Sequence, residues 1–167
     1  MGAKKKNRGA PAPGQDGYSF ARNRRALHEY HVLERFEAGL SLFGSEVKSI
    51  RAGRTSLVEA YCQFVRDELY LMNAHIAEYT QAHSRNHVPL RQRKLLLHRR
   101  ELERLQEAVG PGGLTIIPLS LYAKGGKIKL EIGLCRGKKL HDKRATIKER
   151  EQKREMQRAV REQRDDG

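Results

Sequence analysis

The most regular pattern in the sequence is Lys127-Ile128-Lys129-Leu130-Glu131-Ile132-Gly133-Leu134-Cys135. Its even positions from 128 to 134 are apolar, while its odd positions are mostly charged or small. Successive side chains of a strand point to opposite faces, so this period of two predicts a β-strand with one buried and one wet face. Residues 115–122 form another apolar run, and the turn Lys124-Gly125-Gly126 between the runs predicts a β-hairpin. Pro118 has no N–H for a ladder and therefore indicates a sheet edge or a bulge.

Weaker strand patterns precede this hairpin. Residues 60–65 and 69–72 are apolar and aromatic runs on either side of Arg66-Asp67-Glu68, which predicts a second hairpin. Two shorter strands are expected at residues 30–36 and 40–43, because glycines at positions 39 and 44 interrupt the chain there.

Two segments carry helical patterns. The spacing predicts a helix over residues 89–109, since apolar side chains recur on one face from Leu95 to Val109 and a Gly-Pro-Gly-Gly run follows. The three consecutive leucines that begin at Leu95 are too apolar for one stripe and indicate a bend or a second contact surface. A shorter helix is expected at residues 45–51, ended by Gly53.

About six short strands with one or two helices predict a mainly β protein, a small antiparallel β-barrel of the oligonucleotide-binding (OB-like) type. We expect this barrel over residues 21–140. Residues 1–20 form a basic arm rich in Gly and Pro, which buries too little apolar surface to order and is expected to be disordered. Residues 141–167 form a basic tail of helix-forming residues. Because isolated helices of this length are marginal in water, we expect a tail that is disordered when free and helical against a partner; a solvated helix with no partner is the alternative.

The charge of the chain points to a polyanionic partner. The 167 residues include 34 Lys and Arg and 20 Asp and Glu, a net charge of +14. Residues 21–140 alone hold 21 basic and 12 acidic residues, so the excess lies mainly in the expected barrel. A folded basic domain favours nucleic acid first and an anionic membrane second, while a charge that serves only solubility is the alternative.

Several classes of protein lack support in the sequence. No window is apolar enough for a membrane helix or a signal peptide. Only two cysteines are present, Cys62 and Cys135, far apart in sequence and with no CxxC motif, which argues against a disulfide scaffold and a structural zinc site. The chain therefore reads as a reduced, soluble, intracellular protein. Phosphate-binding glycine loops are absent, Ser45 matches the SxxK pattern of penicillin-type enzymes without its partner motifs, and His28 with His31 forms no complete metal site. We expect no enzyme, no metal and no cofactor.

Five strings of residues resemble one family. They are Asn23-Arg24-Arg25-Ala26-Leu27-His28-Glu29-Tyr30, Glu37-Ala38-Gly39-Leu40-Ser41-Leu42-Phe43-Gly44-Ser45-Glu46-Val47-Lys48-Ser49-Ile50-Arg51-Ala52-Gly53, Arg93-Lys94-Leu95-Leu96-Leu97-His98-Arg99-Arg100-Glu101-Leu102, Gly137-Lys138-Lys139 and Asp142-Lys143-Arg144. Over about residues 20–155 the chain resembles the SsrA-binding protein family, also called small protein B (SmpB).

The resemblance implies an OB-like barrel that binds the tRNA-like domain of transfer-messenger RNA (tmRNA, or SsrA RNA) and delivers it to stalled bacterial ribosomes in trans-translation. It implies partners in the small-subunit decoding centre and the empty mRNA channel, where the tail lies, and in elongation factor Tu and alanyl-tRNA synthetase through the tmRNA complex. We expect a cytoplasmic monomer that binds no membrane. A general single-stranded nucleic-acid binder on the same barrel is the rival interpretation, and the 6 % aromatic content without Trp speaks against it.

The resemblance also implies the site residues. Those expected on the tRNA-like domain are His28, Glu37, Arg93, Lys94, Leu96, His98, Lys138 and Lys139. Those expected in the ribosome-binding tail are His141, Asp142, Lys143, Arg144, Ile147 and Met156. A carboxylate repels phosphate, so Glu37 is expected to accept hydrogen bonds from bases or sugars, or alternatively to orient a neighbouring Arg or cap a backbone N–H. Leu96 is expected to offer a base an apolar platform if it is exposed, and to be core otherwise.

Overall fold

The predicted hairpin is the longest feature of the sheet. The structure, a computed structural model, describes residues 16–165. Strand β8 (Thr115–Lys124) is joined to β9 (Lys127–Gly137) by Gly125 and Gly126, whose φ angles are 58° and 70°. Positive φ at both central residues matches the right-handed twist of a two-residue hairpin, and glycine reaches it without strain. The register shifts between Pro118 and Ser120, which confirms the bulge expected from the proline.

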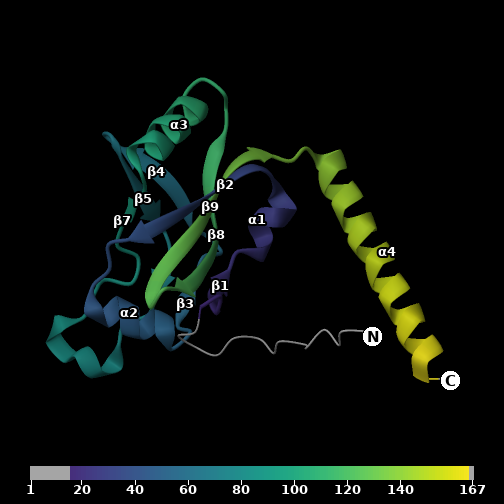
Figure 1. Cartoon of the computed structure of the whole chain (residues 1–167), viewed down its shortest axis with the longest axis horizontal. Helices are drawn as coiled ribbons and strands as arrows, with labels where there is room; N and C mark the ends of the chain where they lie inside the picture. The colour runs from purple at the N-terminus through teal and green to yellow at the C-terminus, as the bar shows by residue number, and fades with distance from the viewer. Residues whose placement is uncertain (1–15, 166–167) are drawn as a thin grey trace, which may run out of the picture.

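The hairpin closes a barrel. The sheet order is β1-β8-β4-β5-β7-β2-β9, and β9 also pairs with β8, so six strands form an antiparallel ring with β1 attached to β8 (Figure 1). The remaining strands of this sheet are β1 (Ser19–Arg22), β2 (Tyr30–Leu40), β4 (Tyr61–Val65), β5 (Glu68–Met72) and β7 (Arg93–Leu96). Strands β3 (Thr55–Ser56) and β6 (His75–Ile76) form a separate pair. The expected OB-like antiparallel barrel with short helices is confirmed.

Strand β2 differs from the two short strands expected there. It runs unbroken through Gly39, and residues 41–43 continue as irregular chain. A Cβ at Gly39 would lie 3.3 Å from the Cβ of Leu96 on the neighbouring strand β7. The glycine therefore permits close approach of two strands inside the sheet, where the sequence suggested an interruption.

The helix expected over residues 89–109 is wrong in its first half. Residues 93–96 form strand β7, with Arg93 and Leu95 buried and Lys94 and Leu96 outside, and only Arg99–Val109 forms helix α3. The backbone N–H of His98 donates to the Glu101 carboxylate (3.1 Å), which fixes the start of that helix. The leucine run thus marks the change from a period of two to a helical period.

The hairpin is buried on both faces at one end. Helix α1 (Arg24–Glu29) covers the side of the hairpin away from the main core, and Ala26, Ile117, Leu119 and Cys135 form a small second cluster there. The expectation of one wet face is wrong at this end for that reason. Burial raises the pKa of the Cys135 thiol to about 11, so this cysteine behaves as core.

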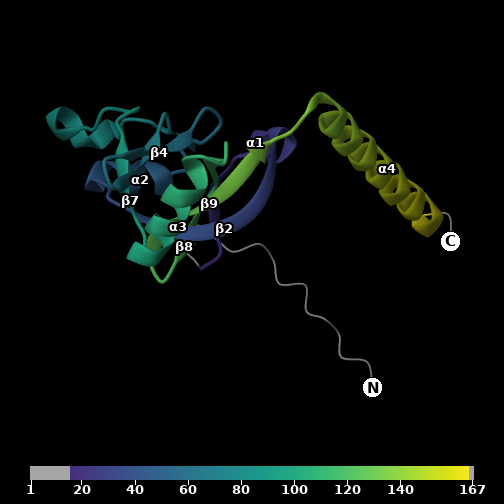
Figure 2. The same ribbon diagram turned by 90° about the horizontal axis from the view of Figure 1, so that it is seen from above.

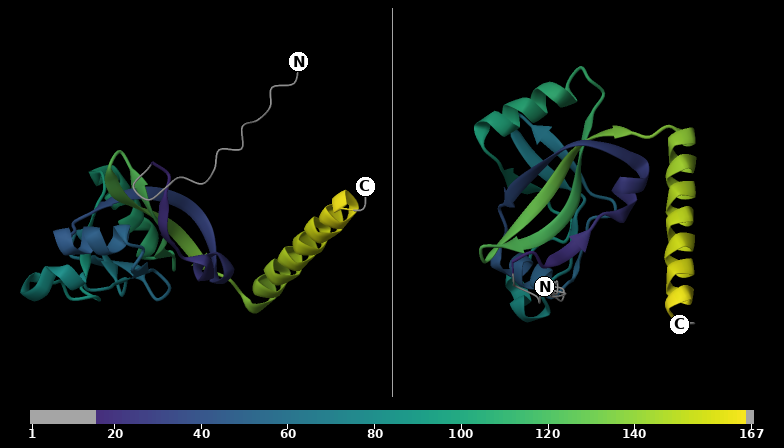
Figure 3. Two further views of the ribbon diagram at one scale, coloured as in Figure 1. Left: turned by 90° about the horizontal axis from the view of Figure 1, so that it is seen from below. Right: turned by 45° about the vertical axis from the view of Figure 1, so that its right-hand side comes forward.

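The remaining helices lie around the barrel and beyond it. Helix α2 (Gly44–Arg51) confirms the expected short helix, and Thr80–Arg85 forms a 3₁₀ helix. Helix α4 (Leu140–Asp165) stands apart from the barrel in every view (Figures 1, 2 and 3). None of the described helices is long and apolar enough to cross a membrane.

The structure bears on both boundaries of the expected barrel. Strand β1 begins at Ser19 and Phe20 is buried, so the last residues of the expected arm 1–20 belong to the barrel, while residues 1–15 lie outside the described residues. The tail expected over residues 141–167 is helical through Asp165 in the structure. Disorder of this tail before it binds a partner stays a prediction.

Candidate nucleic-acid interface

The strand register gathers exposed and partly exposed side chains on one outer face of the barrel. Tyr122 on β8 lies opposite Lys129 on β9, Lys129 lies opposite Gly39 on β2, and Gly39 lies opposite Leu96 on β7. Leu96 is 51 % exposed, which supports the platform expected for it over a core position. We call this surface the outer face and define it by Glu37, Tyr70, Lys94, Leu96, Tyr122, Lys124 and Lys129.

Glu37 is already engaged by its neighbours on this face. Its carboxylate accepts hydrogen bonds from the Tyr122 hydroxyl and from the Lys124 ammonium, at 2.9 and 3.0 Å for the lysine. These two donors lower the pKa of Glu37, so it is ionised at neutral pH. The acid therefore orients a tyrosine and a lysine beside the Leu96 platform, and an exposed carboxylate keeps lone pairs free for a ligand.

Lys94 lies on the same face, one strand further. Its ammonium pairs with Glu68, whose carboxylate also accepts from the Tyr70 hydroxyl at 2.9 Å. Tyr70 and Lys94 are direct cross-strand neighbours. An aromatic ring beside a lysine can stack a base and neutralise a phosphate.

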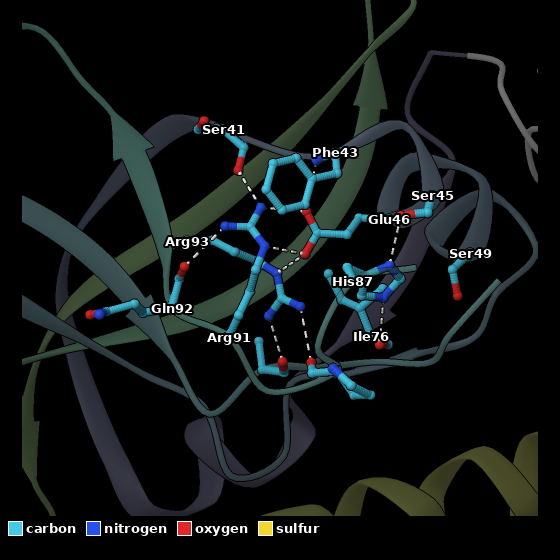
Figure 4. Close-up of polar contacts among 12 residues, drawn as sticks. Ser41, Phe43, Ser45, Glu46, Ser49, Ile76, His87, Arg91, Gln92 and Arg93 are labelled. Atoms are coloured by element: carbon cyan, nitrogen blue, oxygen red, sulfur yellow. Dashed lines mark hydrogen bonds and ion pairs between the residues drawn. The ribbon is translucent and has the colours of Figure 1, made fainter. Parts of the chain in front are cut away.

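Arg93 does not belong to this face. Its side chain is fully buried, and its guanidinium donates to the Glu46 carboxylate (2.7 Å) and to the backbone oxygens of Ala74 (2.7 Å) and Pro89 (2.9 Å) (Figure 4). Strand alternation turns Arg93 inward and Lys94 outward, so the structure gives no exposed Arg93 side chain for the RNA contact expected of it. Arg93 instead fixes the segment before β7 to the barrel.

Glu46 holds a second arginine at the edge of the barrel. Arg91 donates to both Glu46 oxygens (2.9 and 2.5 Å) and lies 4.1 Å from the ring centroid of Phe43. Burial works against the ionised form of Glu46, but hydrogen bonds from Arg91, the Phe43 N–H and Arg93 outweigh it and lower the pKa. The group stays charged and paired.

Ser45 is fastened into the same region. Its hydroxyl lies 2.9 Å from Nδ1 of His87, and Nε2 of His87 lies 2.9 Å from the backbone oxygen of Ile76 (Figure 4). The Lys48 ammonium lies over the Tyr79 ring, 5.3 Å from its centroid. Ser45 therefore helps to attach the segment around His87 to helix α2.

The remaining expected RNA residues form a second group. His28 is at the end of α1, next to the segment in which β9 passes into α4, and Lys139 is exposed there. Lys138 was expected to contact phosphate, but its ammonium is already engaged within the protein. It donates to the backbone oxygen of Leu27 (3.1 Å) and to the Thr146 hydroxyl (2.9 Å). This residue ties α1 to the first turns of α4. We call this surface the junction patch and define it by His28, Lys138, Lys139, His141 and Asp142.

Comparison with known proteins identifies the family of this chain. A model described as SmpB protein matches residues 20–162. The chain belongs to the SmpB family.

Two relatives agree with this assignment. The SsrA-binding protein of Thermobifida fusca (strain YX) is 52 % identical over 151 residues, which cover 90 % of this chain and 94 % of the relative. The SsrA-binding protein of Clostridium beijerinckii is 51 % identical over 144 residues, covering 86 % and 92 %. A chain of the solved structure described as "tmRNA-SmpB: a journey to the center of the bacterial ribosome" is 48 % identical, with a TM-score of 0.60, and the match covers 71 % of this chain and 84 % of that one.

Helix α4 of this SmpB-family chain begins at the junction patch. Asp142 accepts the Lys139 backbone N–H (3.2 Å) and lies 3.1 Å from the His141 ring and 3.5 Å from the His31 ring. Partial burial opposes ionisation of Asp142, but these contacts prevail and lower its pKa. The other expected tail residues lie on α4 at the surface, fully or partly exposed: Lys143, Arg144, Ile147 and Met156. His98, the last expected RNA residue, is exposed at the start of α3.

Four residues of the outer face were missing from the expected set of this SmpB-family chain: Tyr70, Tyr122, Lys124 and Lys129. The alternation in the two hairpins was the available signal, since it assigns them to the side away from the core. Their proximity to Glu37 and Lys94 follows from strand register, which single-sequence alternation does not give. Within residues 16–165, no group of three or more His, Cys, Asp or Glu side chains is arranged to hold a metal ion.

Proposed function

We propose that this chain binds the tRNA-like domain of tmRNA and delivers it to stalled ribosomes in trans-translation. The observation that carries the proposal is the family match over residues 20–162, which includes the barrel and most of α4 together. The relatives named SsrA-binding proteins and the structural neighbour described with tmRNA and the ribosome support the same function. The protein acts by binding, without catalysis, in the cytoplasm.

The barrel and α4 divide the work in this proposal. The outer face offers lysines for phosphates, tyrosines and Leu96 for unstacked bases, and the Glu37 carboxylate for base or sugar donors. Helix α4 carries exposed basic residues and a few exposed apolar ones, Ile147, Met156 and Val160 among them. It occupies the empty mRNA channel near the decoding centre of the small subunit. The protein acts as a monomer, and elongation factor Tu and alanyl-tRNA synthetase meet it through tmRNA.

Binding anisotropy at two salt concentrations tests the proposal. The ligands are the tRNA-like domain of tmRNA, an alanine tRNA and a single-stranded RNA of equal length. We expect preference for the first ligand that survives the higher salt, because shape recognition adds to counterion release. Equal affinities that fall together with salt would support general single-strand binding instead.

Glu37→Ala sharpens this test. The substitution removes the acceptor that orients Tyr122 and Lys124, so we expect weaker binding of the tRNA-like domain with an unchanged unfolding temperature. Glu59→Ala is the matched control, since Glu59 is an exposed acid paired with Arg25 away from this face. A large fall in unfolding temperature for Glu37→Ala would make Glu37 a structural residue.

A further inference from the structure

A surface pocket of about 290 Å³ lies where β1, α1, β2 and the β8–β9 hairpin meet. Its lining includes Arg22, Arg24, Leu27, Arg35, Ser120 and Glu131. None of these residues was expected in the site. Three of the six are arginines, and they come from three different elements.

Asn23 fixes the two arginines that flank it. This residue is only 4 % exposed. Its side chain donates to the Pro118 oxygen (3.0 Å) and accepts the Ala26 N–H (3.1 Å), while its backbone N–H donates to the Leu119 oxygen (2.8 Å). Three hydrogen bonds therefore fix the backbone from which the side chains of Arg22 and Arg24 extend. Because this backbone is already ordered, less conformational entropy is lost when the two arginines bind a ligand.

The pocket has more positive than negative charge. Arg35 donates to the Glu131 carboxylate (3.0 Å), which also accepts from the Ser120 hydroxyl (3.2 Å). Arg22 and Arg24 make no side-chain hydrogen bond or ion pair with any residue in the range 16–161, and both are exposed. Two guanidinium groups without acceptors at one pocket fit an anionic oxygen ligand, and guanidinium matches phosphate with two parallel N–H donors.

The register connects this pocket to the outer face. Arg22 lies opposite Ser120, Ser120 opposite Glu131, and Glu131 opposite Glu37. At the other side of the pocket, Leu27 is followed by His28 and its carbonyl accepts the Lys138 ammonium. The pocket thus lies between the outer face and the junction patch, whose defining residues, all among the described ones, are joined by no hydrogen bond or ion pair.

We propose that this pocket binds a phosphodiester group of the RNA backbone, so that the outer face and the part of the junction patch formed by His28, Lys138 and Lys139 act as one continuous RNA track. The proposal rests on the proposed function, because the RNA is the tRNA-like domain of tmRNA. Arg22 and Arg24 neutralise the phosphate oxygens, and Leu27 and Leu119 offer apolar surface to the adjoining ribose. Glu131 keeps Arg35 in position at the rim.

The test compares Arg22→Ala/Arg24→Ala with Arg54→Ala/Arg85→Ala, which removes the same charge from exposed arginines elsewhere. We expect the pocket variant to bind the tRNA-like domain about tenfold more weakly and its plot of log affinity against log salt to flatten by about one unit. The control variant keeps the wild-type slope. Unfolding temperatures of both variants should match the wild type, since all four side chains are exposed.

Leu27→Glu supplies a second route, because it sets a negative charge beside the pocket at an exposed position. We expect it to weaken binding as well. If the wild type prefers the tRNA-like domain but the pocket variant and Leu27→Glu bind like the control, the pocket proposal is wrong and the proposed function stands. If the wild type shows no preference for the tRNA-like domain, the proposed function itself fails.

Discussion

Helix α4 and the barrel differ in how much of their structure comes from contacts within the chain. The barrel closes a ring of strands over a core that includes Ile50, Leu71 and Leu130, each almost fully buried. In α4, every residue from Lys148 to Arg161 is exposed, and its described contacts with the barrel lie in the first two turns. The barrel can therefore hold the residues of the outer face in place without a ligand, whereas the far part of α4 needs a partner to gain contacts.

The same difference occurs on a smaller scale inside strand β7. Arg93 and Lys94 are consecutive residues, and each pairs with one glutamate. The Arg93–Glu46 pair has no solvent exposure, while the side chains of Lys94 and Glu68 are 42 % and 46 % exposed. The buried pair stabilises the fold, and the exposed pair is available to a ligand.

The largest effect is expected for Glu46→Ala. It leaves Arg93 buried without its carboxylate, and breaking a buried pair in this way costs about 3–5 kcal/mol. The wild-type contribution of Glu46 is present above the pKa of an unfolded glutamate and is lost as the pH falls through its lower folded value. Urea unfolding at neutral pH measures the change. Glu68→Ala is the control, with an expected midpoint close to wild type; equal losses for both variants would contradict the distinction.

A smaller effect is expected from the leucines that follow. Leu95→Ala should destabilise the protein by about 2–5 kcal/mol, because Leu95 is 2 % exposed in the main core. Leu96→Ala should leave stability nearly unchanged and weaken binding of the tRNA-like domain. Unfolding curves and anisotropy on both variants check this. A loss of stability from Leu96→Ala comparable to that of Leu95→Ala would remove the platform from the outer face.

The smallest effect on the barrel is expected from truncation after Lys139. No residue of α4 from Leu140 to Arg161 belongs to the buried core, so the unfolding midpoint should change little. Affinity for the tRNA-like domain should fall less than about tenfold, or 1.4 kcal/mol, while rescue of stalled ribosomes should be abolished. Anisotropy and a reconstituted rescue assay measure the two. Larger loss of RNA affinity would mean that α4 takes part in tmRNA binding.

The sequence predicted the parts of the fold that local pattern specifies. Alternation from Ile128 to Leu134 and two glycines at the turn were enough for the β8–β9 hairpin, and about six short strands with one or two helices led to the OB-like barrel. Strand β7 was mistaken for helix because its four residues lie just before a true helix, and Leu95 falls on the same helical spacing as Leu102, Leu105 and Val109. Short strands carry too few periods to overrule such a neighbour.

The sequence could predict a residue of the candidate site only where its own side chain lies exposed on the surface. Leu96 and Lys94 fall in this class. Arg93 depends on Glu46, 47 positions earlier, and Glu37 depends on Tyr122, 85 positions later. Such pairs are set by tertiary packing, so no local pattern shows whether an arginine faces RNA or a buried acid.

The contacts of Lys138 hold helix α4 at its base, so a small change of angle there moves its far end a long way. The helix has 26 residues, which corresponds to about 39 Å at 1.5 Å per residue. A tilt of about 10° at its base displaces its far end by about 7 Å, more than one helical turn. The Lys138 ammonium, which joins Leu27 to Thr146, thus helps to set the position of residues such as Met156 far from the barrel.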